Sequence, residues 1–197
     1  MITSAQLAQS IHFNEFIALN QDLLKAGKTT GLTQTAEYVE FGRVNLARMQ
    51  RLIKTVVLGP ELLATLQKLT VPHTLVIITE GWCGDSAQIV PVLEHIRLAC
   101  PAMDVVFLLR DEHPELMDQY LTNGARSIPK VICFETSSLK EKWQWGPRPA
   151  KLQAEVKQLL ARQVSHEEKG LFVQNWYNSN KTQDIQEEIT ALVQTLL

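Results

Sequence analysis

The sequence has few cysteines and no cluster of metal-binding side chains. Its three cysteines, Cys83, Cys100 and Cys133, are an odd number at irregular spacing in 197 residues. Such a pattern fits neither a disulfide framework nor a zinc site, whose ligands are clustered. The five histidines are equally scattered. We therefore expect no metal and no other cofactor.

The sequence also has no surplus of basic residues and no long apolar run. A formal net charge of −2 argues against a nucleic-acid partner. No apolar run is long enough to span a bilayer, and the opening MITSAQLAQSIHFNEF has no signal-peptide pattern. We expect no membrane partner and a cytoplasmic location. With 45% hydrophobic and 20% charged residues, the chain has the composition of a globular protein with a real core.

The first 70 residues have a helical pattern of apolar residues. Spacings of three and four predict a helix over 4–26, which Gly27 ends, and a second over 36–58. Gly59-Pro60 closes the second helix and opens a shorter one over 61–69. Residues 1–70 are thus expected to be a helical N-terminal extension.

After residue 70 the pattern changes to short apolar runs that alternate with helices. Residues 71–165 therefore predict an α/β fold with a mixed sheet. Residues 166–197 are expected to be a C-terminal tail packed on this domain, with SHEEKG, 165–170, as a linker and a helix over 184–197. The predicted strands are TLVIIT (74–79), DVVFLL (104–109), VICF (131–134) and KEKWQW (140–145), and the predicted helices cover 86–99, 114–121 and 149–163.

Cys83 lies in WCGDS, residues 82–86, where the first strand gives way to a helix. Open α/β sheets place ligands at this edge, and the positive end of a helix stabilises a thiolate. The position predicts that Cys83 is an exposed, ionised nucleophile. The alternative is a packed, inert cysteine.

Several spaced motifs resemble those of the thioredoxin family. Trp82, Cys83 and Gly84 match its W-C-G, Pro91 stands eight residues beyond the cysteine, and GARSIP, 124–129, precedes a strand as the family's cis-proline segment does. Gly146 matches a further glycine, so the resemblance covers residues 74–152. It implies a thioredoxin fold in which Ile128 and a cis Pro129 face Cys83 and bind an extended disulfide substrate. The residues expected to contact that substrate are Trp82, Gly84, Asp85, Arg126, Ile128 and Pro129.

Three parts of the two-cysteine machinery are absent. Ser86 replaces the second cysteine, Asp85 the intervening proline, and Ile77 a buried aspartate that assists proton transfer in the family. Cys100 lies about 25 Å from Cys83 along its helix, and Cys133 about 13 Å from the site along a strand, so neither can form a disulfide with it. Both are expected to be small buried hydrophobes. An external thiol must resolve any mixed disulfide on Cys83.

Ser86 is the second candidate catalytic residue, and two roles remain open for it. Its hydroxyl can donate to a Cys83 thiolate, or it can cap the helix that follows. Asp85 acts against the thiolate, because a nearby carboxylate disfavours a second negative charge.

Three other groups of residues receive structural interpretations. Arg110 and Asp111 follow the second strand, where turns and caps favour aspartate. Arg48 and Arg51 share a helix face that a solvated stripe explains. Trp176-Tyr177 is expected to anchor the tail.

Three functions follow from these features. The first is one-cysteine thiol–disulfide exchange with a protein disulfide or a low-molecular-weight thiol as partner. The second is a redox-inactive thioredoxin-fold module that binds proteins. The third draws on the C-G-x-S pattern of monothiol glutaredoxins, which bind glutathione and an iron–sulfur cluster. Glu80 stands where those proteins have a lysine, and SSLKEKW lacks their Gly-Gly-x-Asp segment, so this function ranks last.

Overall fold

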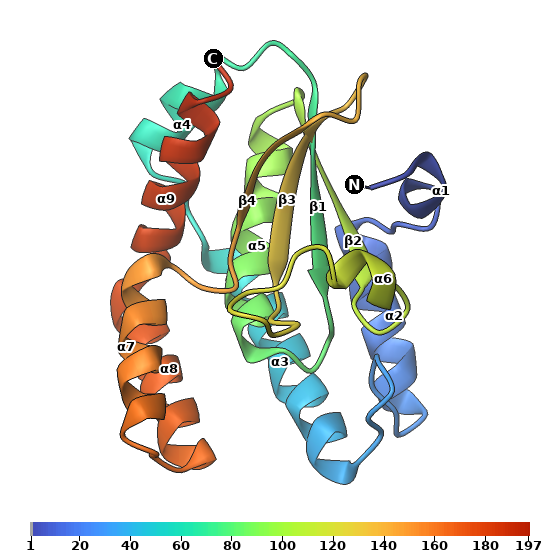
Figure 1. The fold of residues 1–197 in the computed structure, drawn as a ribbon, viewed down its shortest axis with the longest axis vertical. Coiled ribbons are helices and arrows are strands. Elements are labelled where there is room, and N and C mark those ends of the chain that lie inside the picture. Colours follow the sequence, from blue (N-terminus) through green and yellow to red (C-terminus); the bar gives the residue numbers. More distant parts are fainter. Residues whose placement is uncertain (1) are drawn as a thin grey trace.

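The computed structural model describes residues 2–197, which form a mixed four-stranded sheet with helices on both faces (Figure 1). Strand order is β2-β1-β3-β4. β1 runs parallel to β2 and antiparallel to β3, and β3 runs antiparallel to β4. The strands are β1 (His73–Thr79), β2 (Met103–Leu109), β3 (Lys130–Glu135) and β4 (Glu141–Trp145). The expected α/β fold with a mixed sheet is confirmed.

The helices lie before, between and after the strands. α5 follows β1 in the chain and, with β2 after it, forms a parallel crossover, while α7, α8 and α9 follow β4. The helices are α1 (Ser4–Leu7), α2 (Phe13–Lys25), α3 (Ala36–Thr55), α4 (Pro60–Leu66), α5 (Gly84–Ala99), α6 (Pro114–Met117), α7 (Ala150–Ala161), α8 (His166–Asn180) and α9 (Gln183–Gln194).

β1 is one of the two inner strands and is buried on both faces, as its continuous apolar run predicts. Leu75 and Ile77 face the larger core, in which α5 is the central helix, while Val76 and Ile78 face a smaller core that includes Met117 of α6. The strand therefore holds the turn that follows it, which contains Cys83, on a rigid support.

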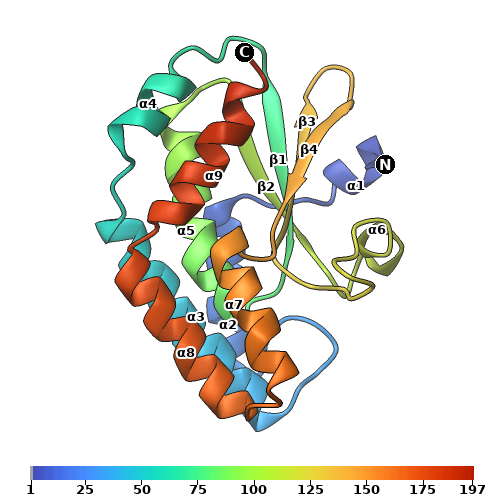
Figure 2. The same ribbon diagram turned by 60° about the vertical axis from the view of Figure 1, so that its left-hand side comes forward.

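The C-terminal helix α9 packs beside α4 and α5 (Figures 1 and 2). Ile185, Ile189 and Val193 are fully buried along its inner face. The indole of Trp145 at the end of β4 donates to Glu188 Oε2 over 2.6 Å. The tail is thus part of the main core.

The helix expected over 4–26 is wrong, because the structure divides it into α1 and α2. Between them, Ile11 pairs with Phe107 at the edge of β2 through two backbone hydrogen bonds of 3.1 and 2.8 Å. The backbone N–H of His12 then donates to Glu15 Oε2 at the start of α2. Pairing with the exposed strand edge outweighs helix continuation here.

The linker expected over 165–170 is also wrong, because these residues begin α8. The hydroxyl of Ser165 accepts a hydrogen bond of 3.0 Å from the N–H of Glu168 and caps the helix. Glu167 and Glu168 lie in the first turn, where negative charge favours a helix. Figure 2 shows α8 and α3 at the same end of the molecule, where Arg48 of α3 donates a hydrogen bond to Gln174 of α8.

No helix within residues 2–197 combines the length and apolar character needed to cross a membrane.

Candidate functional site

The site is built around the turn between β1 and α5. β1 ends at Thr79, and Cys83 occupies the N-cap position of α5 with extended backbone dihedrals. Its N–H donates to the carbonyl of Glu80 across the turn. As the resemblance implies, the cysteine stands at the end of the sheet where a helix begins.

Cys83 is not the exposed thiolate that the sequence predicts. Its side chain is only 7% exposed, and the thiol donates to the carbonyl of Ile128 at 3.3 Å. Burial raises the pKa of Cys83 to about 11, and the nearby Asp85 carboxylate adds to the rise. The expectation of an exposed, ionised Cys83 is therefore wrong, because loss of hydration outweighs the helix N-terminus.

Ser86 lies beside Cys83 and does not cap the helix. Its side chain is 1% exposed and its hydroxyl accepts a 2.7 Å hydrogen bond from Thr79. A hydrogen bond from Ser86 favours the Cys83 thiolate and so lowers the pKa of Cys83. Burial and the charge of Asp85 each raise this pKa by more than this hydrogen bond lowers it. The capping role is wrong, because Cys83 itself is the N-cap.

The segment with Ile128 and Pro129 faces Cys83, and the peptide bond between these residues is cis. Ile128 is 6% exposed, and its carbonyl already accepts the Cys83 thiol. This differs from the expected arrangement, in which Ile128 offers its backbone to an extended substrate.

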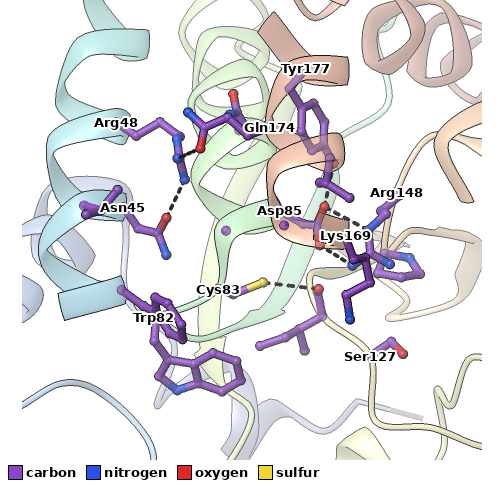
Figure 3. Close-up of a pocket in the computed structure, with 18 of the residues that line it drawn as sticks. Asn45, Arg48, Trp82, Cys83, Asp85, Ser127, Arg148, Lys169, Gln174 and Tyr177 are labelled. Carbon is purple, nitrogen blue, oxygen red and sulfur yellow. Dashed lines mark hydrogen bonds and ion pairs between the residues drawn. The ribbon is translucent and has the colours of Figure 1, made fainter. Parts of the chain in front are cut away.

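A cavity of about 650 Å³ opens at this turn (Figure 3). α3 and α8 line it on either side of the start of α5, and the loops after β2, before β3 and after β4 complete it. Trp82, Cys83, Gly84, Asp85, Arg126 and Ile128, expected from the sequence, all line it. The lining residues that the sequence analysis did not assign to a site include Tyr38, Asn45, Arg48, Gln88, Arg148, Lys169 and Tyr177.

Asp85 joins three segments through a buried network (Figure 3). Arg148, after β4, donates from Nε to Oδ1 at 2.9 Å and pairs with Oδ2 at 2.6 Å. The hydroxyl of Tyr177 in α8 donates to Oδ1 at 2.9 Å. Burial raises the pKa of Asp85, and Arg148 opposes this rise. The carboxylate thus holds α8 against α5, and Tyr177, 4% exposed, confirms the expected anchor of the tail.

Aromatic side chains form one wall of the cavity. The rings of Tyr38 and Trp82 lie 5.1 Å apart, and Phe41 lies 5.8 Å from Tyr38. The guanidinium of Arg110 lies over Trp82, 4.9 Å from the ring centre. This wall offers flat apolar surface to a ligand.

The sequence predicts that Arg48 belongs to a solvated stripe, and this prediction is wrong. Arg48 is half-buried, lines the cavity, and donates to Asn45 Oδ1 at 2.6 Å and to Gln174 Oε1 of α8. Burial lowers the pKa of Arg48, and the neighbouring Arg51 contributes. The difference arises because α8 lies across the cavity from α3 and its Gln174 reaches Arg48, which the sequence pattern of α3 alone does not reveal.

Arg126 and Asp111 are engaged in ion pairs. Arg126 forms two hydrogen bonds of 2.6 Å with Asp118 at the border of the cavity. Asp111 accepts from Arg110 at 2.8 Å and from the N–H of Leu32 at 2.9 Å, while its own N–H donates to the buried Glu80. These contacts tie the loop before α3 to the sheet and support the structural interpretation of Asp111.

Cys100 and Cys133 are free and buried, as expected. Within the described part of the chain, no group of three or more His, Cys, Asp and Glu residues has the arrangement of a metal site.

Comparison with known proteins identifies a family and a fold. A family model described as thioredoxin matches residues 32–162, about two thirds of the chain, from before α3 to α7. None of the curated proteins compared with the chain matches it. A protein of unknown function from Pseudomonas aeruginosa, PA1234, is similar in structure with a TM-score of 0.66 and 16% identity over 100% of both chains. An HIV epitope scaffold is similar with a TM-score of 0.57 and 13% identity, covering 88% of this chain and 96% of the scaffold. At these identities the structural likeness concerns the fold alone, and the thioredoxin-like character of that fold rests on the family match.

Proposed function

Since the chain belongs to the thioredoxin family, we propose that it uses this fold to bind a small organic molecule in the cavity beside Cys83. The observation that carries this proposal is the position of α3 and α8, which flank the face where the family's extended substrates would lie. A small molecule fits between these helices more readily than a folded protein partner.

The size and lining of the cavity support a small ligand. Its volume of about 650 Å³ falls within the roughly 300–1,000 Å³ that such sites occupy. Its lining combines the Tyr38–Trp82 wall with the side chains of Arg48 and Lys169. Apolar walls with a few polar groups are typical of small-molecule sites.

The state of Cys83 argues for binding rather than redox catalysis. With a pKa of about 11, only about one thiol in 10⁴ is ionised at pH 7. The thiolate is the nucleophile in disulfide exchange, so the resting site is a poor exchanger. The absence of a resolving cysteine agrees with this.

A blocked cavity tests the proposal. A Cβ on Gly170 of α8 has no atom within 4 Å, so Gly170→Trp adds an indole at the cavity without a clash at its base. Leu171→Trp is the matched control, because Leu171 is 62% exposed and outside the cavity lining. We expect small molecules that raise the melting temperature of the unmodified chain and of L171W to lose this effect on G170W.

The variant Cys83→Ser is expected to keep the ligand-dependent rise in melting temperature, because the proposed function needs no thiolate. Equal stabilisation of G170W and L171W would overturn the cavity as the binding site. A library of small organic molecules that stabilises none of the variants would overturn the function itself.

A second function, one-cysteine exchange with a small disulfide, is favoured by one observation: Cys83 lines the cavity. The Cys83 thiolate would attack a disulfide RSSR, form Cys83–S–S–R and release RS⁻, and an external thiol would then attack the mixed disulfide and regenerate Cys83. Mass spectrometry after incubation with hydroxyethyl disulfide at pH 7.5 tests it. Rapid modification of Cys83 that a small thiol reverses would favour exchange, and no modification over hours would exclude it.

A further inference from the structure

We infer that the ligand of the cavity is an organic anion, with an apolar body against the aromatic wall and a carboxylate or phosphate over the first turns of α5. This inference rests on the proposed function and names the chemical class of its ligand.

The guanidinium of Arg48 is the first group that indicates an anionic ligand. This half-buried group makes hydrogen bonds to two neutral amides, those of Asn45 and Gln174, and forms no ion pair within residues 2–197. Removing a cation from water without a carboxylate partner is unfavourable. An anionic ligand would supply that partner.

The start of α5 lies next to this guanidinium. A Cβ built on Gly84 would have Arg48 Nη1 and Asn45 Oδ1 as its nearest neighbours, both at 3.9 Å. Because Gly84 has no side chain, it leaves room for a ligand at the positive end of a 16-residue helix. The cation and the helix end carry the same sign, so one anion would stabilise both.

Gln88 is an independent indication of a ligand. It lies one turn beyond Gly84 on the same face of α5 and lines the cavity. Its side chain is only 5% exposed, yet its amide makes no hydrogen bond to any described residue. The amide itself is not fully buried and lines the cavity, where a carboxylate or phosphate oxygen would accept its N–H.

The remaining charges of the cavity also favour an anion. Arg110, Arg126 and Arg148 are paired with Asp111, Asp118 and Asp85. Lys169 of α8 forms no ion pair within residues 2–197, and Figure 3 shows it extending toward the loop that carries Ser127. Glu40, the other carboxylate of the lining, is paired with Arg43. Arg48 and Lys169 therefore face the cavity without an ion-pair partner of their own among the described residues, although the charge of Asp85, which is paired with Arg148, acts on both.

Three ligands of one shape and different charge test the inference by isothermal titration: 2-naphthoate, 2-naphthyl phosphate and the neutral 2-naphthamide. We expect at least one anion to bind the unmodified chain about tenfold more tightly than the amide. Arg48→Gln should remove most of this preference for the anion. Gln88→Leu should weaken binding of the anions more than binding of the amide. Arg48→Lys should retain the preference because it keeps the charge.

Arg51→Gln is the matched control, since Arg51 is an exposed arginine on the same helix that does not line the cavity. Melting temperatures establish that each variant is folded. The amide binding as tightly as both anions, or R48Q leaving their ratio unchanged, would overturn the anionic ligand and leave the proposed function intact. If none of the three ligands binds, but the wider library contains molecules whose binding Gly170→Trp abolishes, the anionic ligand is overturned and the proposed function is not. No binding by any small molecule overturns both.

Discussion

Cys83 is the side chain of the thioredoxin motif whose chemistry its surroundings alter. A cysteine at the start of a helix ordinarily has a lowered pKa, because the helix N-terminus stabilises the thiolate. Here burial and the Asp85 carboxylate raise the pKa of Cys83 to about 11, against the hydrogen bonds from Ser86 and Asp85. The motif around a cysteine therefore does not determine its ionisation.

The alkylation rate of Cys83 should reflect this pKa. In a variant with Cys100→Ala and Cys133→Ala, we expect iodoacetamide to react at pH 7.5 about a hundredfold more slowly than with an exposed thiol, since the pKa is about two units higher. The rate should rise about tenfold per pH unit as the thiolate fraction grows, and level off only near pH 11. Asp85→Asn should move this midpoint to lower pH, because it removes a negative charge. Intact-mass kinetics measure the alkylation rate at each pH for the variants with and without Asp85→Asn. A rate that reaches its plateau below pH 8 would contradict the buried neutral thiol.

Gly146 is a residue whose lack of a side chain is structurally required. Its φ is +103°, and a Cβ there would lie 2.5 Å from the backbone oxygen of Pro129. Gly146→Ala should lower the free energy of unfolding by about 2–3 kcal/mol, because the backbone must move away from the cis-proline segment. The control Gly170→Ala, in open space within α8, should be neutral or stabilising by up to about 1 kcal/mol. Urea unfolding measures the free energy of unfolding of both variants. Similar changes for Gly146→Ala and Gly170→Ala would contradict the requirement for glycine at position 146.

Among the elements, α8 decides what the site can do. It supplies Lys169, Gln174 and Tyr177 to the cavity and contacts α3 through the Arg48–Gln174 hydrogen bond. The network of Tyr177, Asp85 and Arg148 holds it at the start of α5. A helix far from Cys83 in the sequence therefore forms a side of its cavity.

Removal of one hydroxyl should loosen this helix. Tyr177→Phe keeps the ring and deletes the hydrogen bond to Asp85, which we expect to reduce stability by about 1.5–3 kcal/mol, since the acceptor is a buried carboxylate. Amide hydrogens of α8 should exchange faster, while those of β1 change less. Tyr38→Phe is the matched control, because the Tyr38 hydroxyl makes no hydrogen bond to any described residue. Hydrogen–deuterium exchange that leaves α8 as protected as in the unmodified chain would contradict the anchoring role.

The sequence predicts the central elements well and the edges of the chain less well. β1, β2 and β3 are apolar runs between turn residues, a strong local signal, while β4 alternates polar and aromatic residues, and all four strands lie where these patterns predict. The sequence does not predict α8, because its apolar residues are confined to 171–177 and form no stripe along the helix, although Ser165 followed by Glu168 is a capping signal. The break after α1 depends on pairing of Ile11 with β2, which no local pattern reveals.

At the scale of the whole molecule, the fold could be predicted from the sequence and the cavity could not. Trp82, Cys83, Pro129 and Gly146 carry the thioredoxin pattern in their spacing. The cavity requires α3 and α8, which lie more than 100 residues apart, to stand on two sides of α5. The role of Arg48 follows from that packing. Cys83 is buried in the smaller core together with Ile78 and Ile128, whereas its motif alone suggests an open redox site that the tertiary structure does not provide.

The hydrophobic core draws on the whole chain, which has consequences for unfolding. Phe16 of α2, Leu62 of α4, Leu75 of β1 and Ile189 of α9 belong to one cluster of buried side chains. Because the N-terminal helices and the tail share this core with the sheet, we expect them to unfold with it in one cooperative transition.

Three probes of thermal unfolding test this cooperativity: far-UV circular dichroism, tryptophan fluorescence and calorimetry. Their transitions should coincide, with equal calorimetric and van't Hoff enthalpies. A chain ending at Gln163 should lose this transition, since it lacks the fully buried Ile185, Ile189 and Val193 and leaves Leu62 and Leu66 of α4 uncovered. A separate low-temperature transition of the full chain, absent from a truncated chain that otherwise unfolds normally, would show instead that the tail is an independent unit. In that case the cavity beside Cys83 would lose the wall formed by α8 whenever the tail detached, and ligand binding would be lost at that temperature.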